Sequence, residues 1–229
     1  MRFLHLAFGF AVLALAALQP VHAEDAVNTP VYIVTYFEVA PPVGQAAAAI
    51  RSYAEASRKQ DGNTAFDAFE EIGRPSRFAT FEAWRDKKAA EAHGASPLAT
   101  GFRDKLAPQL VGPFEVRVFN GFSLAPPRAQ GGREAVYVVT HVDVFPAGKD
   151  QAAGLVTALA EAGRKDAGNL WFDVLQQDGH ANHFTLVEAW RDHSAFEAGI
   201  MAAHTRDFRQ KLTPLEGALY DERLYRKLP

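Results

Sequence analysis

The chain has 229 residues, a formal net charge of −3 and no cysteine. The lack of cysteine excludes disulfide bonds, a thiol nucleophile and a lipid-anchored cysteine. Lys and Arg are interspersed with Asp and Glu, so the sequence predicts no basic face of the kind that binds nucleic acid. It also contains no phosphate-binding glycine motif and no Gly-x-Ser-x-Gly nucleophile turn.

The first 23 residues have the features of a secretory signal peptide. A basic start at Arg2 is followed by an apolar run, 6–18, and by a small residue at the expected cut, Ala23. The apolar run is short for a membrane span, although an uncleaved anchor is the alternative. We therefore expect a soluble mature protein in the periplasm or outside the cell, with no membrane contact after cleavage.

The rest of the chain is a tandem repeat. The segment 81–86, which contains Glu-Ala-Trp-Arg-Asp, recurs at 187–192. From Arg58 to Pro108 the two copies align without a gap at a spacing of 106 residues, and about 21 of the 51 positions are identical. We predict two similar domains, 24–122 and 135–229, joined by a Pro- and Gly-rich linker at 123–134.

In chain order, the first copy begins with a run rich in β-branched and aromatic residues that ends at two prolines, which predicts a strand and a turn. An alanine-rich segment with helical spacing follows, and Asp86 is expected to cap a second helical region that Pro97 interrupts. The predicted elements are strand 31–39, helix 45–59, strands 65–71 and 77–84, helix 86–106 and strand 114–119.

The second copy repeats this order. Its predicted elements are strand 136–144, helix 148–165, strands 170–176 and 183–190, helix 192–212 and a strand near 218–225. This β-α-β-β-α-β order is the ferredoxin-like pattern of the α+β class. Because both faces of the third strand in each copy are largely apolar, we expect the two sheets to pack face to face as an intramolecular barrel.

The motifs of both copies resemble those of the antibiotic biosynthesis monooxygenase (ABM) family, within the dimeric α+β barrel superfamily. The resemblance covers nearly all of the chain after residue 23. Its carriers are Gly-Asn and Phe-Asp at the start of the second strand, the Glu-Ala-Trp-Arg-Asp motif, and aromatic and histidine residues on the second helix. In the second copy these are Gly168, Asn169, Phe172, Asp173, 188–192, Ala195, His204 and Phe208.

The resemblance implies a pocket between the sheet and the helices of each copy, sized for a flat aromatic substrate. Monooxygenases of this family use no metal or flavin, because a deprotonated phenol-like substrate reacts directly with molecular oxygen. Such chemistry requires a base, a hydrogen-bond donor for the developing anion and a dry pocket. No cofactor is therefore expected.

Two pairs of matching residues at the end of the third strand are the first site candidates. Trp84 and Trp190 either line the pocket or simply anchor the core. Glu82 and Glu188 lie on the same strand face as the tryptophans, so burial would raise their pKa and make them candidate bases. The alternative is that these carboxylates bridge to arginine or cap a helix, with Arg58 and Arg164 as the obvious arginine partners in the respective copies.

The histidines differ between the copies. His93 of the first copy aligns with Gly199, and His204 of the second copy aligns with Leu98. His204 is expected to face the pocket as an acid or base, or to be a core histidine with satisfied hydrogen bonds. His93 precedes a glycine near a helix end, where we expect it to be exposed.

Further candidates lie on the first strand and around the second pocket. Tyr36 and His141 occupy matching positions on the first strand of each copy, where they could donate to a substrate oxygen or form half-buried packing. In the second copy, the substrate is expected to contact Phe172, Phe208 and Asn169 as well as Trp190. The candidate catalytic set is therefore His204, Glu188, His141 and His93.

The leading functional hypothesis is a secreted, cofactor-independent monooxygenase that acts on a quinol or polyphenolic compound, with molecular oxygen as the second substrate. The first alternative is a periplasmic module that binds a small aromatic or haem-like ligand without chemistry. Haem-degrading relatives use an Asn on the first strand, where this chain has Tyr36 and His141, although His93 or His204 could still bind haem. A structural stress-response protein is the third hypothesis, and further association into homo-oligomers is left open.

Overall fold

The computed structural model describes residues 29–126, 129 and 131–228, so the predicted signal peptide lies outside the described residues. Two repeats of the same order are present. Repeat one contains β1 (Val31–Glu38), α2 (Gly44–Ser57), β2 (Asn63–Glu71), β3 (Arg74–Trp84), α3 (Lys87–Gly94), α4 (Pro97–Leu106) and β4 (Glu115–Ser123). Repeat two contains β5 (Val136–Asp143), α5 (Lys149–Gly163), β6 (Asn169–Gln177), β7 (His183–Trp190), α6 (His193–Ile200), α7 (Ala203–Leu212) and β8 (Asp221–Lys227).

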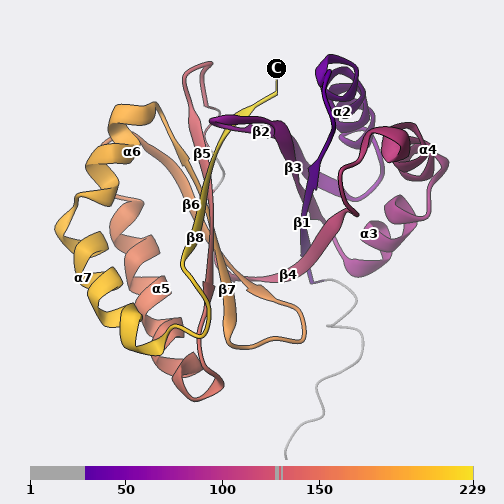
Figure 1. Cartoon of the computed structure of the whole chain (residues 1–229). Coiled ribbons are helices and arrows are strands. Elements are labelled where there is room, and N and C mark those ends of the chain that lie inside the picture. Colours follow the sequence, from indigo (N-terminus) through magenta and orange to yellow (C-terminus); the bar gives the residue numbers. More distant parts are fainter. Residues whose placement is uncertain (1–28, 127–128, 130, 229) are drawn as a thin grey trace, which may run out of the picture.

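The eight strands form one closed barrel in the order β1-β3-β2-β8-β5-β7-β6-β4. The last strand of each repeat joins the two halves, because β4 pairs with β1 and with β6, and β8 pairs with β5 and with β2. Figure 1 shows α2, α3 and α4 on one side of the barrel and α5, α6 and α7 on the opposite side. The prediction of two ferredoxin-like repeats packed as an intramolecular α+β barrel is confirmed.

Alternation along each strand explains why both faces are apolar. On β3, Ala79 and Phe81 belong to the cluster inside the barrel, whereas Phe78 and Trp84 belong to the cluster beneath the helices. Closure also leaves no free edge in the sheet. The interior is filled by aromatic and aliphatic side chains of both repeats, including Tyr32, Phe69, Phe119, Tyr137, Trp171 and Tyr225.

The second helical region is broken in both repeats. In repeat one, Asp86 caps α3 as predicted, accepting from Ala89 N at 2.8 Å, and Ser96 caps α4. In repeat two, the prediction of one continuous helix over 192–212 is wrong. There α6 ends at Ile200 and α7 begins at Ala203, and the Thr205 hydroxyl donates to the Gly199 carbonyl at 2.8 Å, which satisfies an acceptor at the end of α6.

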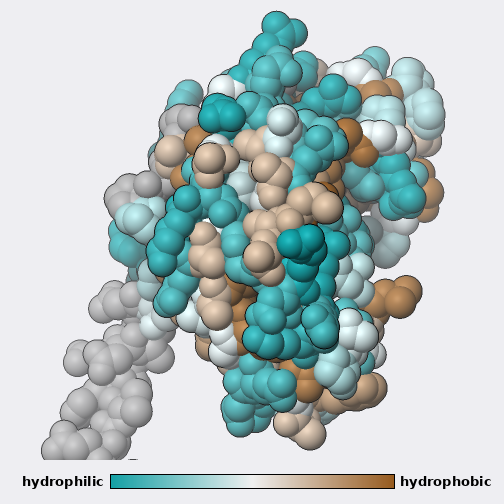
Figure 2. Space-filling view, turned by 90° about the vertical axis from the view of Figure 1, so that its left-hand side faces the viewer, coloured by the Kyte–Doolittle hydropathy of each residue, from teal (hydrophilic) through white to brown (hydrophobic). Residues whose placement is uncertain are grey.

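The outer surface of the repeat-two helices is mainly hydrophilic. Figure 2 views this side of the molecule, where polar side chains surround smaller apolar patches. No helix in the described part of the chain is long and apolar enough to cross a membrane.

Candidate functional site

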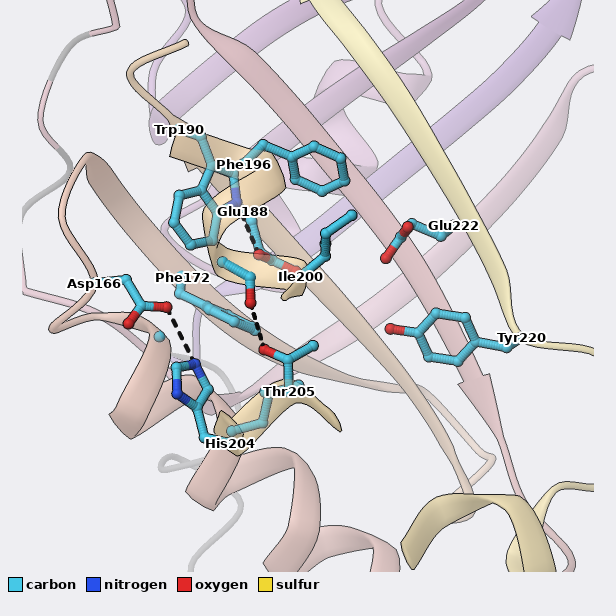
Figure 3. Close-up of a pocket in the computed structure, with 13 residues that line it drawn as sticks. Asp166, Phe172, Glu188, Trp190, Phe196, Ile200, His204, Thr205, Tyr220 and Glu222 are labelled. Carbon is cyan, nitrogen blue, oxygen red and sulfur yellow. Dashed lines mark hydrogen bonds and ion pairs between the residues drawn. The ribbon is translucent and has the colours of Figure 1, made fainter. Parts of the chain in front are cut away.

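A pocket lies between the sheet and the helices of repeat two (Figure 3). Its walls combine apolar side chains with a group of polar ones. The apolar residues include Leu159, Phe172, Trp190, Phe196 and Ile200, and the polar residues are Asp166, Glu188, His204, Thr205, Tyr220 and Glu222. The enclosed space is only about 20 Å³, enough for roughly one water molecule. A larger ligand therefore requires side chains to move.

Glu188 is the buried acid of this pocket. It lies on β7 opposite Val138 and Phe172, and its Oε2 accepts a hydrogen bond from the Trp190 indole at 2.9 Å. Burial raises the pKa of Glu188 to about 8, although the indole hydrogen bond opposes the rise. At neutral pH this carboxyl is consequently protonated for most of the time and can donate a hydrogen bond.

Tyr220, just before β8, and Glu222, on β8, face Glu188. Figure 3 shows the Tyr220 hydroxyl and the Glu222 carboxylate reaching toward the side of the pocket where Glu188 lies. Arg209 of α7 donates to Glu222 Oε2 at 3.0 Å, and its guanidinium is 5.0 Å from the centre of the Tyr220 ring. Burial raises the pKa of Glu222, and Arg209 opposes that rise. The pocket thus pairs a protonated carboxyl with a carboxyl that an arginine keeps closer to ionisation.

His204 lies at the rim of the pocket. Its Nε2 is 3.1 Å from Asp166 Oδ2, and both side chains are about one quarter exposed. In Figure 3 this nitrogen is directed at Asp166 rather than at Glu188 or Glu222. His204 therefore lines the cavity without presenting Nε2 to its interior.

Gly199 sets the position of the Trp190 indole. A Cβ at this glycine would lie 2.4 Å from Trp190 Cη2, which is closer than any real contact. His93 holds the equivalent position in repeat one, where its ring stacks on Trp84 at 4.5 Å. The absent side chain in repeat two therefore leaves room for the indole.

The equivalent region of repeat one is filled by side chains. Glu82 again accepts from the indole of Trp84, at 3.0 Å, and burial raises its pKa to about 7. His93 lies 3.7 Å from Glu82 and is only 5% exposed, so the expected exposure of His93 is wrong. The helix end that was expected to expose it instead packs against the sheet, and burial lowers the pKa of His93 to about 4. A more open pocket of about 370 Å³ adjoins this region, and Gln60, Trp84, Arg85 and His93 are among the residues that line it.

Tyr36 and His141 do not share the pocket with Glu188. Both point into the barrel, on the sheet face opposite the helices, and Tyr36 Oη is 2.9 Å from His141 Nε2. Burial lowers the pKa of His141 to about 3. Tyr36 and His141 do occupy equivalent positions of β1 and β5. Because side chains alternate along a strand, these two point into the barrel, at the interface between the repeats.

The remaining candidates are separated. Phe172 lines the pocket and Phe208 packs in the core beneath the helices, whereas the buried amide nitrogen of Asn169 has no hydrogen-bond partner among the described residues. The expected pairs between glutamate and arginine are absent from the described residues. Arg58 donates instead to the Phe66 carbonyl and Arg164 to the Phe172 carbonyl. Each arginine therefore satisfies a backbone acceptor on the second strand of its own repeat.

Sequence reasoning missed Tyr220, Glu222 and Asp166. The last strand was predicted too early, near 218–225, so its alternation could not be assigned; the strand begins at Asp221. Asp166 aligns with Gln60, and each contacts the histidine of its own repeat, His204 or His93. The equivalent position of Gln60 and Asp166 in the two copies was the available signal, although the histidines that they contact are not equivalent. Among the described residues, no three acidic or histidine side chains form a group that could hold a metal ion.

Comparison with known proteins identifies the family. The model of the family described as antibiotic biosynthesis monooxygenase matches residues 30–105 and again residues 135–211. The chain belongs to this family. The two ABM matches together cover most of the sequence, one in each repeat.

Relatives and solved structures agree with the ABM assignment. "Putative monooxygenase YcnE" of Bacillus subtilis (strain 168) is 32% identical over 66 residues, which cover 29% of this chain and 70% of that protein. A "Putative monooxygenase" of Fusobacterium nucleatum has a TM-score of 0.79 at 16% identity, covering 88% of this chain and 93% of the other. An "anthrone oxidase-like protein" has a TM-score of 0.66 at 14% identity, covering 88% and 92%. At these identities the two structures show that the fold is shared.

Proposed function

We propose that this protein is a cofactor-independent monooxygenase that oxidises a quinol or related polyphenolic compound, and that its chemistry takes place in repeat two. The observation that carries the proposal is the arrangement of Glu188 opposite Glu222 and Tyr220 in a pocket with apolar walls. Repeat one retains Glu82 but has filled the corresponding space with its own side chains.

The two carboxyl groups have complementary roles in this proposal. Glu222, held by Arg209, accepts the proton of a substrate hydroxyl and leaves an electron-rich anion. Protonated Glu188 donates a hydrogen bond to the second substrate oxygen as charge develops there. The apolar walls formed by Phe172, Phe196 and Ile200 exclude water from the anion.

Molecular oxygen is the oxidant. The quinol anion transfers electrons to oxygen, and a ring carbon forms a bond with one oxygen atom. Loss of water from the resulting hydroperoxide breaks the O–O bond and gives a hydroxyquinone. A naphthoquinol and one molecule of oxygen thus yield a hydroxynaphthoquinone and one molecule of water, so no further reductant is needed.

Substrate entry requires the pocket to expand, because its present space holds about one water. The side chains that close it include Trp190 and Ile200 at the α6 end of the pocket and Tyr220 immediately before β8. The rim pair of His204 and Asp166 would then lie beside the entering ring.

Oxygen consumption with menadiol tests the proposal, with Glu188→Gln and the matched variant Glu82→Gln. We expect Glu188→Gln to lower the enzymatic rate by about 100-fold, within the usual range for a lost acid or base. The Glu82→Gln variant should stay within about twofold of the natural protein, because repeat one is filled. Equal losses in both variants would contradict the assignment to repeat two. No uptake above the blank with several quinols would exclude the activity, and saturable binding without uptake would favour a binding module.

The export of the protein is a separate part of the proposal and is supported by the basic start and apolar run of residues 1–23. Fractionation of the producing cell and N-terminal sequencing of the mature protein test it. A mature chain that begins near residue 24 and is found outside the inner membrane is the expected result. Retention of the full-length chain in the cytosol would contradict it.

A further inference from the structure

The pocket region of repeat one contains a tyrosine ring where repeat two has an aliphatic side chain. Tyr53 of α2 aligns with Leu159 of α5. Its ring stacks on Phe102 at 3.9 Å between centres and 2° between planes, and Phe66 meets it edge-on at 5.2 Å. The Tyr53 ring is therefore held as a flat aromatic ligand would be, with one face covered and one edge packed.

The hydroxyl of Tyr53 also has a hydrogen-bond partner. It lies 2.7 Å from His93 Nε2, and His93 Nδ1 is in contact with Gln60 Oε1. Because the amide oxygen of Gln60 can only accept, Nδ1 carries the proton and Nε2 accepts the Tyr53 hydroxyl. Glu82 lies 3.7 Å from the same nitrogen. The result is a buried slot with a single well-placed acceptor.

The ring and histidine contacts come from outside the helix that carries Tyr53, and Ser57 of that helix also interacts with the Tyr53 side chain. Phe66 lies on β2, His93 on α3 and Phe102 on α4, while Gln60 is in the loop before β2. The slot would therefore keep its walls and its acceptor if the tyrosine ring were deleted. Repeat two has Leu159 in place of the ring and Gly199 in place of the acceptor, so the slot belongs to repeat one alone.

We propose that repeat one is a binding site for small neutral phenols that the chain occupies with its own Tyr53. Phe102 and Phe66 select a flat ring, and His93 selects a hydroxyl donor over a plain hydrocarbon. The nearby carboxyl of Glu82 disfavours anionic ligands. While Tyr53 occupies the slot, the slot binds no free ligand. The inference does not depend on the function proposed for repeat two, since it concerns binding in the other half of the molecule.

The test removes the Tyr53 ring by substitution and adds phenol in solution to take its place. The melting temperatures of full-length Tyr53→Ala and of the natural protein are measured at increasing concentrations of phenol and, for comparison, of benzene. We expect Tyr53→Ala to melt several degrees below the natural protein and to regain much of the loss with phenol in a saturable manner. Benzene should restore less, and neither compound should shift the natural protein appreciably. A phenol effect no larger than that of benzene, or equal in both proteins, would overturn the proposal.

Two matched variants separate recognition of the hydroxyl from filling of a cavity. Phe102→Ala also removes an aromatic ring but leaves the Tyr53 hydroxyl on His93, so benzene should restore it at least as well as phenol. Adding His93→Leu to Tyr53→Ala should abolish the preference for phenol. If Tyr53→Ala does not fold alone, its refolding yield with and without phenol and the melting of Tyr53→Leu, the repeat-two residue, replace the first measurement. No phenol effect in either case would overturn the proposal.

Discussion

Tyr36 and His141 occupy equivalent positions in the two repeats and meet inside the barrel, where Tyr36 Oη lies 2.9 Å from His141 Nε2. In a dimer of identical chains, a residue on the symmetry axis would meet its own copy. Here the covalent duplication has allowed a tyrosine to face a histidine. His141 Nδ1 contacts Thr185 Oγ1 at 2.9 Å, so both ring nitrogens have partners. This contact between the repeats therefore requires two different sequences, one with tyrosine and one with histidine at the equivalent position.

Removal of the Tyr36 hydroxyl should therefore destabilise the whole barrel. Tyr36→Phe leaves His141 Nε2 buried without its partner, which costs about 1–3 kcal/mol of unfolding free energy. Urea denaturation measures this loss. In the double variant Tyr36→Phe, His141→Leu the lone polar group is gone, so part of the stability should return. A double variant as weak as the sum of the single variants would argue against direct coupling.

The fold could be predicted because the evidence for it is local and appears twice. The apolar runs, the turn residues and the Asp86 cap each specify an element, and the repeated Glu-Ala-Trp-Arg-Asp motif fixes the correspondence between copies. Closure of the barrel also followed from the sequence, since a third strand that is apolar on both faces must be covered on both faces.

The site was less predictable because it depends on strand parity and on the filling of space. Glu188 and Trp190 were identified because they share one face of their strand. Tyr36 and His141 instead lie on the opposite face of the sheet, inside the barrel. Glu222 was missed because the sequence does not show how β8 pairs with β5, where Glu222 lies opposite Thr140, and this register decides which residues point to the pocket. No sequence pattern shows that the ring of Tyr53 packs where repeat two has Leu159 beside a small pocket.

The raised pKa of Glu188 should make stability depend on pH. The folded protein holds this proton to about pH 8, whereas the ordinary value is 4.5. Between these values the folded state binds more protons than the unfolded state, so its stability falls as the pH rises. In Glu188→Gln the contribution of Glu188 to the slope, at most about 1.4 kcal/mol per pH unit, should be lost, while that of Glu82 remains. Urea midpoints at pH 5, 6, 7 and 8 measure it, and an unchanged slope would show that Glu188 does not titrate in this window.

A methyl group at residue 199 should disturb the pocket. Gly199→Ala places Cβ against the Trp190 indole, and displacement of the ring should cost about 1–3 kcal/mol despite the gain in helix propensity. Gly154 of α5 is the matched control, because nothing lies within 4 Å of its added Cβ. Gly154→Ala should be neutral or stabilising by up to about 1 kcal/mol. Thermal melts compare the two variants, and similar effects would mean that the indole adapts freely.

The role proposed for Arg209 leads to a prediction on the pH dependence of activity. Its guanidinium holds Glu222 closer to ionisation in the folded protein, so Arg209→Gln should raise the pKa of Glu222 further. If ionised Glu222 is the base, the acid limb of kcat/KM against pH should move to higher pH in this variant, with the rate largely recovered on the alkaline side. Arg103→Gln is the control, since Arg103 occupies the equivalent position in repeat one and donates to the Gly94 carbonyl. Its profile should match that of the natural protein. A uniform loss of rate at every pH in Arg209→Gln, with an unmoved acid limb, would assign Arg209 to packing against Tyr220 and remove Glu222 as the base.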